Sequence, residues 1–195
     1  MSAVLKDPMS LEAFLDWESR QELKYEFDGF QPVAMTGVSV EHSRIQRNLV
    51  TALTNRLRGH RCEAHGSDLK IRVVGRIRYP DAFIVCALVP PGASVVHDPV
   101  VVFEILSPGT SSTDRYEKNQ EYRSTPSIQR YVILEQSRMG ATVYSRSGDD
   151  WVVQLVLGEA DLALPEVGIT LPMAELYEGV AFSPGSGEAR TDAPG

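Results

Sequence analysis

One acidic residue interrupts the most apolar segment of the chain. The run Val100–Leu106 reads VVVFEIL, and a short continuous apolar run of this kind is typical of a strand buried in a sheet. Glu104 stands inside the run, and an ionised carboxylate is costly to bury unless a cation or hydrogen-bond donors compensate it. Glu104 is therefore a salt-bridged core acid, an acid that faces solvent at a sheet edge, or part of a functional site.

A second acid, Asp81, lies near the start of the preceding β-prone segment, Tyr79–Cys86. If the two segments pair as antiparallel strands, Phe83 lies opposite Val102 and Asp81 lies opposite Glu104, with their Cβ atoms about 5 Å apart. Like charges opposed in this way destabilise a sheet, whereas a divalent cation between them reverses the sign of the interaction. Mg²⁺ prefers oxygen ligands and commonly takes one or two carboxylates together with water.

The helical segment after Glu104 supplies a cation. Asp114, Lys118 and Tyr122 are spaced four residues apart, so they share one helix face. Glu104 precedes the turn by roughly the 10 Å by which Lys118 follows it, so the lysine can reach the carboxylate. A lysine beside two carboxylates and a metal can orient a water or stabilise a pentavalent phosphate. The alternative is a surface ion pair with Asp114 or Glu121, which contributes little.

The remaining elements predict a mixed sheet with helices packed on it, an α/β (α+β) fold. Apolar residues four apart indicate a long helix that follows Ser39 and ends at Gly59, and Asp28–Gly29 favours a two-residue hairpin turn. We expect one domain over residues 1–182 and a disordered tail over 183–195, which is rich in Pro, Gly and Ser. The other expected elements are a helix over 11–19, strands over 68–74, 77–86, 100–106 and 130–135, a helix from a Ser111–Asp114 capping box to 123, and a hairpin over 141–157.

Charge is unevenly distributed along a chain whose formal net charge is −7. The stretch 44–78 holds nine basic residues and two acidic ones, whereas the residues from 149 onward hold nine acidic residues and one basic one. A basic stretch can bind the phosphates of nucleic acid even when the net charge is negative. Arg44, Arg47, Arg72 and Arg78 are therefore candidates for nucleic-acid binding, and the alternative is an ordinary solvated face.

Cysteine content and hydropathy limit the class of protein. Cys62 and Cys86 are too few for a disulfide framework or a four-thiolate zinc site, and the spacing of His60, Cys62 and His65 fits no standard zinc pattern. No apolar run approaches the ~20 residues that a membrane span needs. The N-terminal residues also lack the basic and apolar regions of a signal peptide. We expect a reduced, cytoplasmic protein with no membrane partner.

Several segments together resemble the Uma2 family, a group of bacterial restriction-endonuclease-like proteins in the PD-(D/E)XK nuclease superfamily. The resemblance runs from about Met9 to Val180 through KYEFDGFQPVAM, EHSRI, SDLKIRV, RYPDAFIV, VVFEILSPGT, DRYEK, YRSTPSIQRYVILEQ and LPMAELYEGV. It implies a restriction-endonuclease-like core, with a central mixed sheet flanked by helices, to which this chain adds an N-terminal and a C-terminal hairpin. It also implies metal-dependent hydrolysis of phosphodiester bonds.

The resemblance assigns roles to three residues. Pro80–Asp81 matches the PD element and Glu104 matches the acid of the following strand, so both would hold Mg²⁺ or Mn²⁺. The lysine of the superfamily normally stands two residues after that acid, where this chain has Leu106. The resemblance therefore implies that Lys118, on the next helix, takes the place of this lysine. If Lys118 is not near the metal, the domain binds DNA without cutting it.

Three further residues are candidates for accessory roles. Glu26 matches a glutamate typical of the family, and it either ligates the metal or supports the N-terminal hairpin. His42, near the start of the long helix, either contacts phosphate or a general base or is structural. Asp68 is expected in a strand beside that of Asp81, where it would support the metal ligands from behind.

The leading hypothesis is a Mg²⁺- or Mn²⁺-dependent DNA endonuclease with Asp81, Glu104 and Lys118 at its site. The alternative is a non-catalytic module that binds nucleic acid or a protein partner on the same fold, which Leu106 and the acidic balance favour. We also expect a homodimer, because nuclease folds that cut both strands often pair. Trp151 marks the C-terminal hairpin as a self-association surface, since tryptophan is enriched at interfaces.

Overall fold

The computed structural model describes residues 8–106 and 112–182; the side chains of residues 112–115 are not among those described. Its strands form a six-stranded sheet in the order β11-β10-β9-β8-β6-β3, a five-stranded sheet in the order β2-β1-β5-β4-β7, and the pair β12-β13. The elements are α1 (Leu11–Glu18), β1 (Tyr25–Phe27), β2 (Pro32–Ala34), α2 (Val40–Leu57), β3 (Glu63–Gly66), β4 (Lys70–Val73), β5 (Arg76–Arg78), β6 (Ala82–Val85), β7 (Val95–Val96), β8 (Pro99–Leu106), α3 (Ser112–Ser124), β9 (Arg130–Glu135), β10 (Gly140–Ser147), β11 (Asp150–Leu157), β12 (Asp161–Leu164), β13 (Ile169–Pro172) and α4 (Met173–Leu176).

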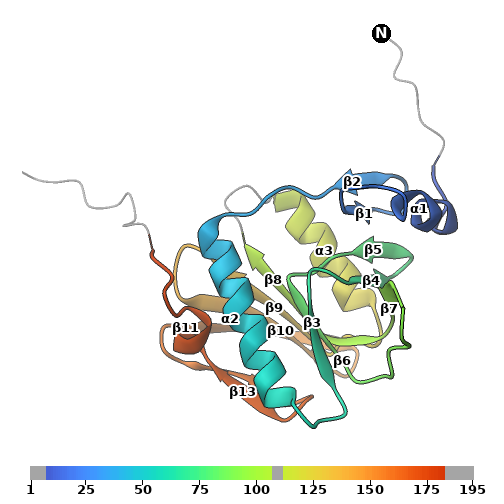
Figure 1. The fold of residues 1–195 in the computed structure, drawn as a ribbon. Coiled ribbons are helices and arrows are strands. Elements are labelled where there is room, and N and C mark those ends of the chain that lie inside the picture. The colour runs from blue at the N-terminus through green and yellow to red at the C-terminus, as the bar shows by residue number, and fades with distance from the viewer. Residues whose placement is uncertain (1–7, 107–111, 183–195) are drawn as a thin grey trace, which may run out of the picture.

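Helices cover both faces of the six-stranded sheet, with α2 on one side and α3 on the other (Figure 1). The core on the α2 side includes Leu49 and Leu53 and extends to β12, β13 and α4. The core on the α3 side packs Tyr122 against the sheet together with Phe83 and residues of β4. α1 and the β1–β2 hairpin close a third, smaller cluster around Phe14. The two layers of helix therefore sandwich β8, which carries Glu104, and β6, which begins directly after Asp81.

The long helix forms where its apolar spacing predicts it. Ser39 caps α2, its Oγ accepting a hydrogen bond from the His42 amide at 3.2 Å. Ile45, Leu49 and Leu53 are fully buried along one face, which confirms the four-residue apolar period.

The expected register of the two acid-bearing strands is confirmed. Phe83 pairs with Val102 and Ala82 pairs with Phe103 in an antiparallel ladder. A β-bulge shifts the ladder after Ile84, so Val85 pairs with Pro99 and not with Val100, the partner that the expected register gives it. β8 then pairs in parallel with β9, and α3 makes the crossover between them. The six-stranded sheet is therefore mixed.

The expected strand over 77–86 is broken. β5 ends at Arg78 in the five-stranded sheet, and β6 begins at Ala82 in the six-stranded sheet. Pro80 stands between them and has no amide proton to donate to a ladder, which explains the interruption. The break places Asp81 at the point where the chain passes from one sheet to the other.

Other differences from the sequence predictions are local. The hairpin at Asp28 has a four-residue loop, because the Asp28 carboxylate accepts hydrogen bonds from the amides of both Phe30 and Gln31. Asp68 lies in a turn and not in a strand. Four short strands, two to four residues long, were not predicted from the sequence: β3, β7, β12 and β13. The proposed Ser111–Asp114 capping box and the tail over 183–195 lie outside the described residues.

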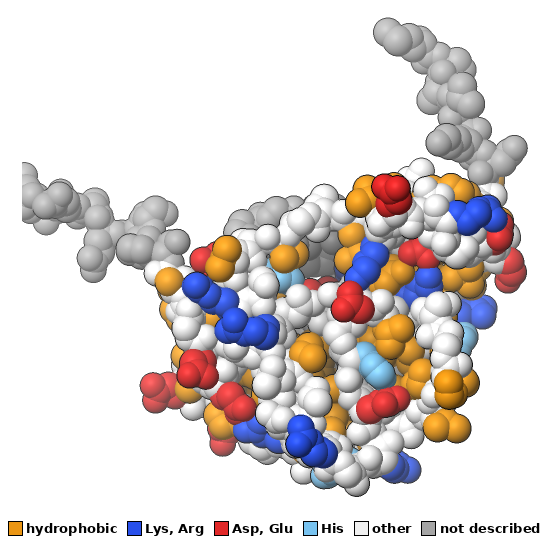
Figure 2. Space-filling view, in the orientation of Figure 1, with side chains coloured by type: hydrophobic (Ala, Val, Ile, Leu, Met, Phe, Trp, Pro, Cys, Tyr) orange, Lys and Arg blue, Asp and Glu red, His pale blue; other side chains and the backbone are white. Residues whose placement is uncertain are grey.

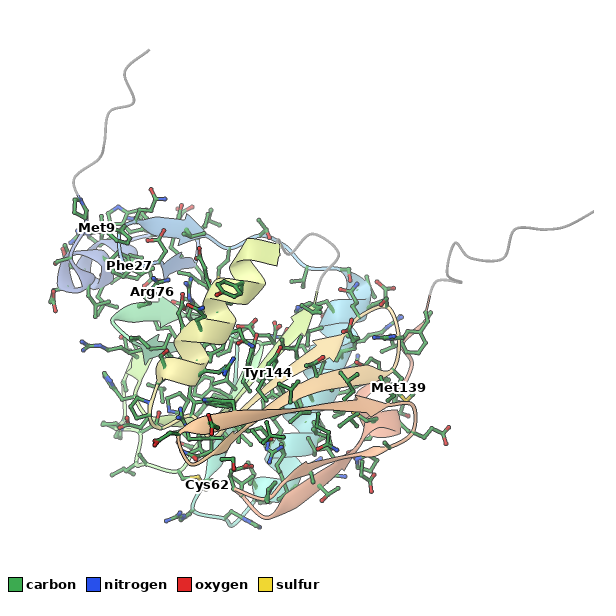
Figure 3. The ribbon with its side chains drawn as sticks, turned by 180° about the vertical axis from the view of Figure 1, so that it is seen from behind. Met9, Phe27, Cys62, Arg76, Met139 and Tyr144 are labelled. Carbon is green, nitrogen blue, oxygen red and sulfur yellow. A yellow bond between two sulfur atoms is a disulfide. The ribbon has the colours of Figure 1, made fainter. Side chains whose placement is uncertain are left out.

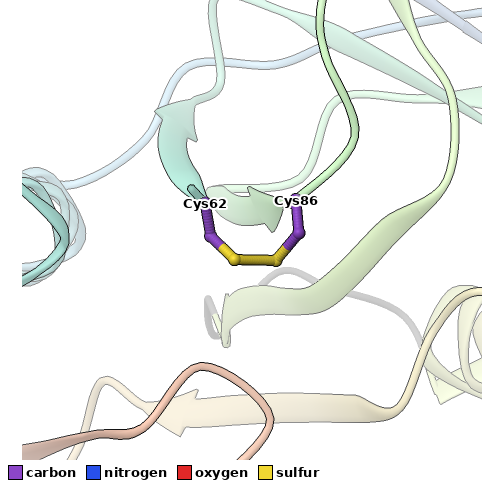
Figure 4. The surroundings of a disulfide bond; sticks show 2 residues. All are labelled: Cys62 and Cys86. Atoms are coloured by element: carbon purple, nitrogen blue, oxygen red, sulfur yellow. A yellow bond between two sulfur atoms is a disulfide. The ribbon is translucent and has the colours of Figure 1, made fainter. Parts of the chain in front are cut away.

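Cys62 and Cys86 form a disulfide, so the expectation of reduced thiols is wrong (Figure 4). The β3–β6 ladder explains the contact. Glu63 pairs with Val85, so Cys62, directly before β3, lies opposite Cys86, directly after β6. Among the described residues, no helix is both long enough and apolar enough to cross a bilayer.

Candidate active site

Asp81 is held in place by donors from two directions. Its Oδ2 atom accepts a 2.7 Å hydrogen bond from the Ile105 amide and lies 3.2 Å from His42 Nε2. Gln46 Nε2 donates to the Asp81 carbonyl oxygen at 3.0 Å and approaches Oδ1 at 3.4 Å. Asp81 therefore has a fixed orientation, set by α2 on one side and by β8 on the other.

Glu104 lies beside Asp81 in an environment that favours its neutral form. Burial, aided by the negative charges of Asp81 and Glu26, raises the pKa of Glu104 to about 7. Lys118, with Nζ 3.4 Å from Glu104 Oε1, opposes this rise, as does a 2.6 Å hydrogen bond from the Tyr122 hydroxyl. The site thus holds more negative charge than its lysine compensates.

Glu26 joins this cluster from the N-terminal hairpin. Its Oε1 lies 3.2 Å from Lys118 Nζ and accepts a 3.1 Å hydrogen bond from the Tyr79 amide. Its Oε2 accepts from Arg78 at 3.0 Å. Glu26 and Glu104 therefore both contact the ammonium group of Lys118 and help to fix its position.

Arg78 is one of the predicted phosphate contacts, and that prediction is wrong because the side chain is buried. Only 3 % of the side chain is exposed, and the guanidinium also donates hydrogen bonds to Glu121 at 2.7 Å. Burial alone would lower the pKa of Arg78, but its hydrogen bonds to Glu121 and the charge of Glu26 outweigh burial and raise the pKa. Arg78 therefore pairs with buried carboxylates and is not accessible to a phosphate.

The basic stretch does not form one continuous face. Figure 2 shows Lys and Arg side chains over α2 with acidic side chains close by. Arg47 and Arg72 are exposed and Arg44 is half-buried, so these three stay available to a polyanion. Three further basic residues of the stretch are engaged in ion pairs, namely Arg56 with Glu175, Lys70 with Glu18, and Arg76 with Glu121.

Two accessory candidates separate clearly in the structure. His42 is buried against Asp81, and its Nδ1 atom has no hydrogen-bond partner among the described residues. Asp68 has a fully exposed side chain that pairs with Lys24 at 2.6 Å. Gln46 was not predicted from the sequence as a site residue, but it contacts Asp81 directly. The signal was present, because Gln46 follows His42 by one helical turn on the same face of α2.

The donors at this site fit a hard divalent cation. No group of three or more His, Cys, Asp or Glu side chains is arranged as a metal site within residues 8–106 and 112–182. Mg²⁺ and Mn²⁺, however, prefer oxygen ligands, and Mg²⁺ is held in many proteins by one or two carboxylates with water. Asp81 and Glu104 provide such a pair, and a cation would offset both the burial of Glu104 and the neighbouring negative charges, which together raise its pKa.

Comparison with known proteins identifies the family. The sequence model of Uma2, described as "Putative restriction endonuclease", matches residues 11–174. The chain belongs to the Uma2 family. The resemblance carried by the sequence segments is thereby confirmed. Two relatives from Synechocystis sp. (strain ATCC 27184 / PCC 6803 / Kazusa) are the uncharacterized proteins slr1290 and sll1609. The first is 33% identical over 89% of this chain and 94% of its own length, and the second is 24% identical over 75% and 86%.

The fold of this Uma2 chain also matches a solved structure. A crystal structure of a putative nuclease belonging to DUF820 from Anabaena variabilis ATCC 29413 superposes with a TM-score of 0.74. The match covers 88% of this chain and 98% of that one at 18% sequence identity. The expected fold class is therefore confirmed: a restriction-endonuclease-like α+β fold, with mixed sheets flanked by helices.

Proposed function

We propose that this Uma2 protein is a divalent-metal-dependent nuclease that hydrolyses phosphodiester bonds of DNA at Asp81, Glu104 and Lys118. The observation that carries the proposal is the position of Lys118, whose Nζ lies 3.4 Å from Glu104 Oε1 and 3.2 Å from Glu26 Oε1. Leu106 occupies the usual lysine position, and Lys118 reaches the same acid from the crossover helix. The Uma2 family assignment and the nuclease-like fold support the same activity.

Each residue has a distinct task in this proposal. Asp81 and Glu104 would hold Mg²⁺ or Mn²⁺, which supplies Lewis-acid polarisation of the phosphate and a lowered pKa for bound water. Lys118 keeps a positive charge beside the acids, where it orients the attacking water or offsets charge on the phosphate. Tyr122 fixes Glu104 through its 2.6 Å hydrogen bond, so the carboxylate does not rotate away.

Binding of the DNA backbone is assigned to the basic residues that stay accessible. Arg44 and Arg47 lie on α2, the helix that also carries His42 and Gln46, and Arg72 lies on β4. Their guanidinium groups suit phosphate oxygens. Two chains joined as a homodimer would carry two such sites, one for each strand of a duplex.

The test compares two aspartates, Asp81 in the candidate site and Asp68 on the surface. Asp81→Asn removes a charge from the cluster, and Asp68→Asn removes one from an exposed turn. We expect wild type and Asp68→Asn to bind Mn²⁺ in calorimetric titrations and to cut plasmid DNA. Asp81→Asn should lose both, with a cleavage rate at least ~10³-fold lower. Cleavage by Asp81→Asn at the wild-type rate would show that the site is assigned wrongly.

A non-catalytic binding module remains the second candidate. Leu106 favours it, because the superfamily's usual lysine is absent from that position. In this case wild type would bind duplex DNA or a protein partner, but it would neither take up Mn²⁺ nor cut DNA when both are supplied. The titration repeated with duplex present separates the two functions.

A further inference from the structure

β11 is a long and unprotected edge of the six-stranded sheet (Figure 3). Native edge strands are usually short, charged, interrupted by proline or covered. β11 is eight residues long and has neither proline nor charge from Trp151 to Leu157. The opposite edge, β3, has four residues and carries Glu63 and His65. Side chains of β11 that are 51–61% exposed are Val152, Val153, Leu155 and Leu157.

Within the part of the chain that the structure describes, no helix packs over Val153 and Leu155 of this strand. Val153 lies opposite Tyr144 and Leu155 lies opposite Thr142, so these four side chains share the sheet face on which α3 packs. A cavity of about 360 Å³ lies between α3 and the outer strands, with Tyr116 of the helix and Tyr144 of β10 among its walls. Val153 and Leu155 therefore lie exposed beyond α3, whereas the Trp151 ring has the Arg123 guanidinium of α3 at 5.8 Å.

The sequence of β11 is symmetric about Gln154. The strand reads WVVQLVL, with apolar residues one, two and three positions away on either side of the glutamine. A contact between two identical copies about a twofold axis requires a surface that is complementary to itself. An antiparallel strand pair with this sequence meets that condition, whereas an unrelated partner would not require the symmetry.

We propose that two copies of the chain pair through β11, antiparallel and about a twofold axis at Gln154, to form a continuous twelve-stranded sheet. In this register Val153 of one copy lies opposite Leu155 of the other, and Trp151 lies opposite Leu157. These cross-strand pairs are apolar throughout, and each pair of this kind stabilises a sheet. A single strand pair buries an area at the low end of specific interfaces, so the dimer is concentration-dependent.

The register is tested by a single engineered thiol. Both natural cysteines are joined in the Cys62–Cys86 disulfide, so Gln154→Cys adds the only free thiol. Opposed Cα atoms in an antiparallel pair are about 4.5–5.5 Å apart, within the range of a disulfide. Val152→Cys is the matched control, because its two copies lie four residues apart along the strands, roughly 13 Å.

We expect Gln154→Cys to form a covalent dimer under mild oxidation and Val152→Cys to remain monomeric on a non-reducing gel. Equal crosslinking of both variants would overturn the register.

Sedimentation equilibrium tests the association itself. Leu155→Lys should weaken the dimer at least ~10-fold, whereas Leu88→Lys, at an exposed residue outside β11, should not. A wild-type chain that stays monomeric up to ~100 μM, or that binds other proteins only, would overturn the proposal. The outcome does not depend on nuclease activity.

Discussion

Two clusters of buried charge lie side by side in this protein, and they differ in balance. In the first, Arg78 and Arg76 face Glu121, and Arg78 also faces Glu26, so each carboxylate meets a guanidinium. In the second, Glu104 pairs with Lys118 while Asp81 lies against His42, and burial together with the neighbouring negative charges raises the pKa of Glu104. Glu26 belongs to both, because it pairs with Arg78 and with Lys118.

The difference is the one expected between a structural cluster and the proposed functional site. Buried charges that compensate each other hold the chain together, and removal of one partner leaves another stranded. Buried acids without enough cations cost stability, which a fold tolerates where a ligand supplies the missing charge. The balanced cluster therefore supports the unbalanced one, with Glu26 as the link.

The largest expected effect comes from breaking the balanced cluster. Arg78→Met leaves Glu26 and Glu121 buried without their common partner, so the free energy of unfolding should fall by about 3–5 kcal/mol. Arg72→Met, on the adjacent strand with an exposed side chain, should change it by less than about 0.5 kcal/mol. Urea unfolding of both variants provides the measurement. Equal stability of the two would mean that the balanced cluster is not structural.

The next effect is a pH dependence that belongs to the unbalanced cluster. Because the pKa of Glu104 rises from 4.5 unfolded to about 7 folded, the native state binds more protons than the unfolded state between these values. The metal-free protein should therefore lose about 2–3 kcal/mol of stability as pH rises from 4.5 to 7. Glu104→Gln should remove that loss, measured by unfolding in EDTA across this pH range. Glu22→Gln, at an exposed acid, should leave the slope unchanged.

The smallest effect sharpens the comparison at a neutral residue. Gln46→Ala removes the amide that fixes Asp81, so Mn²⁺ affinity should fall about 10–100-fold, as for other residues that orient a metal ligand. The free energy of unfolding should change by less than about 1.5 kcal/mol. Thr51→Ala, at an exposed position of the same helix, is the control for both quantities. An unchanged Mn²⁺ affinity would show that Gln46 does not orient the site.

The sequence predicted the part of the site that lies close together along the chain. Glu104, Lys118 and Tyr122 follow one another through a strand and a helix, so their spacing alone brings them together. The register that opposes Asp81 and Glu104 followed from two apolar strands joined by a loop. These contacts depend on regular geometry, which residue spacing determines.

Contacts between distant segments could not be predicted in this way. A count of charges along the chain placed Arg78 on a basic surface, but its burial depends on Glu26, which is 52 residues away. The disulfide depends on the pairing of β3, a strand too short to recognise by period. Gln46 shares a helix face with His42, but its role depends on a carbonyl and a carboxylate 35 residues later, which helix spacing does not reveal.

The β8–α3–β9 crossover also bears on the order in which the protein folds. Lys118 and Tyr122 meet Glu104 across only 14 and 18 residues, whereas Lys118 meets Glu26 across 92. Loop closure costs more entropy as the loop lengthens, so contacts within the crossover form before those to the N-terminal hairpin. We expect Glu104 and Lys118 to come together in an early folding nucleus. The N-terminal hairpin should dock afterwards, when Glu26 pairs with Lys118.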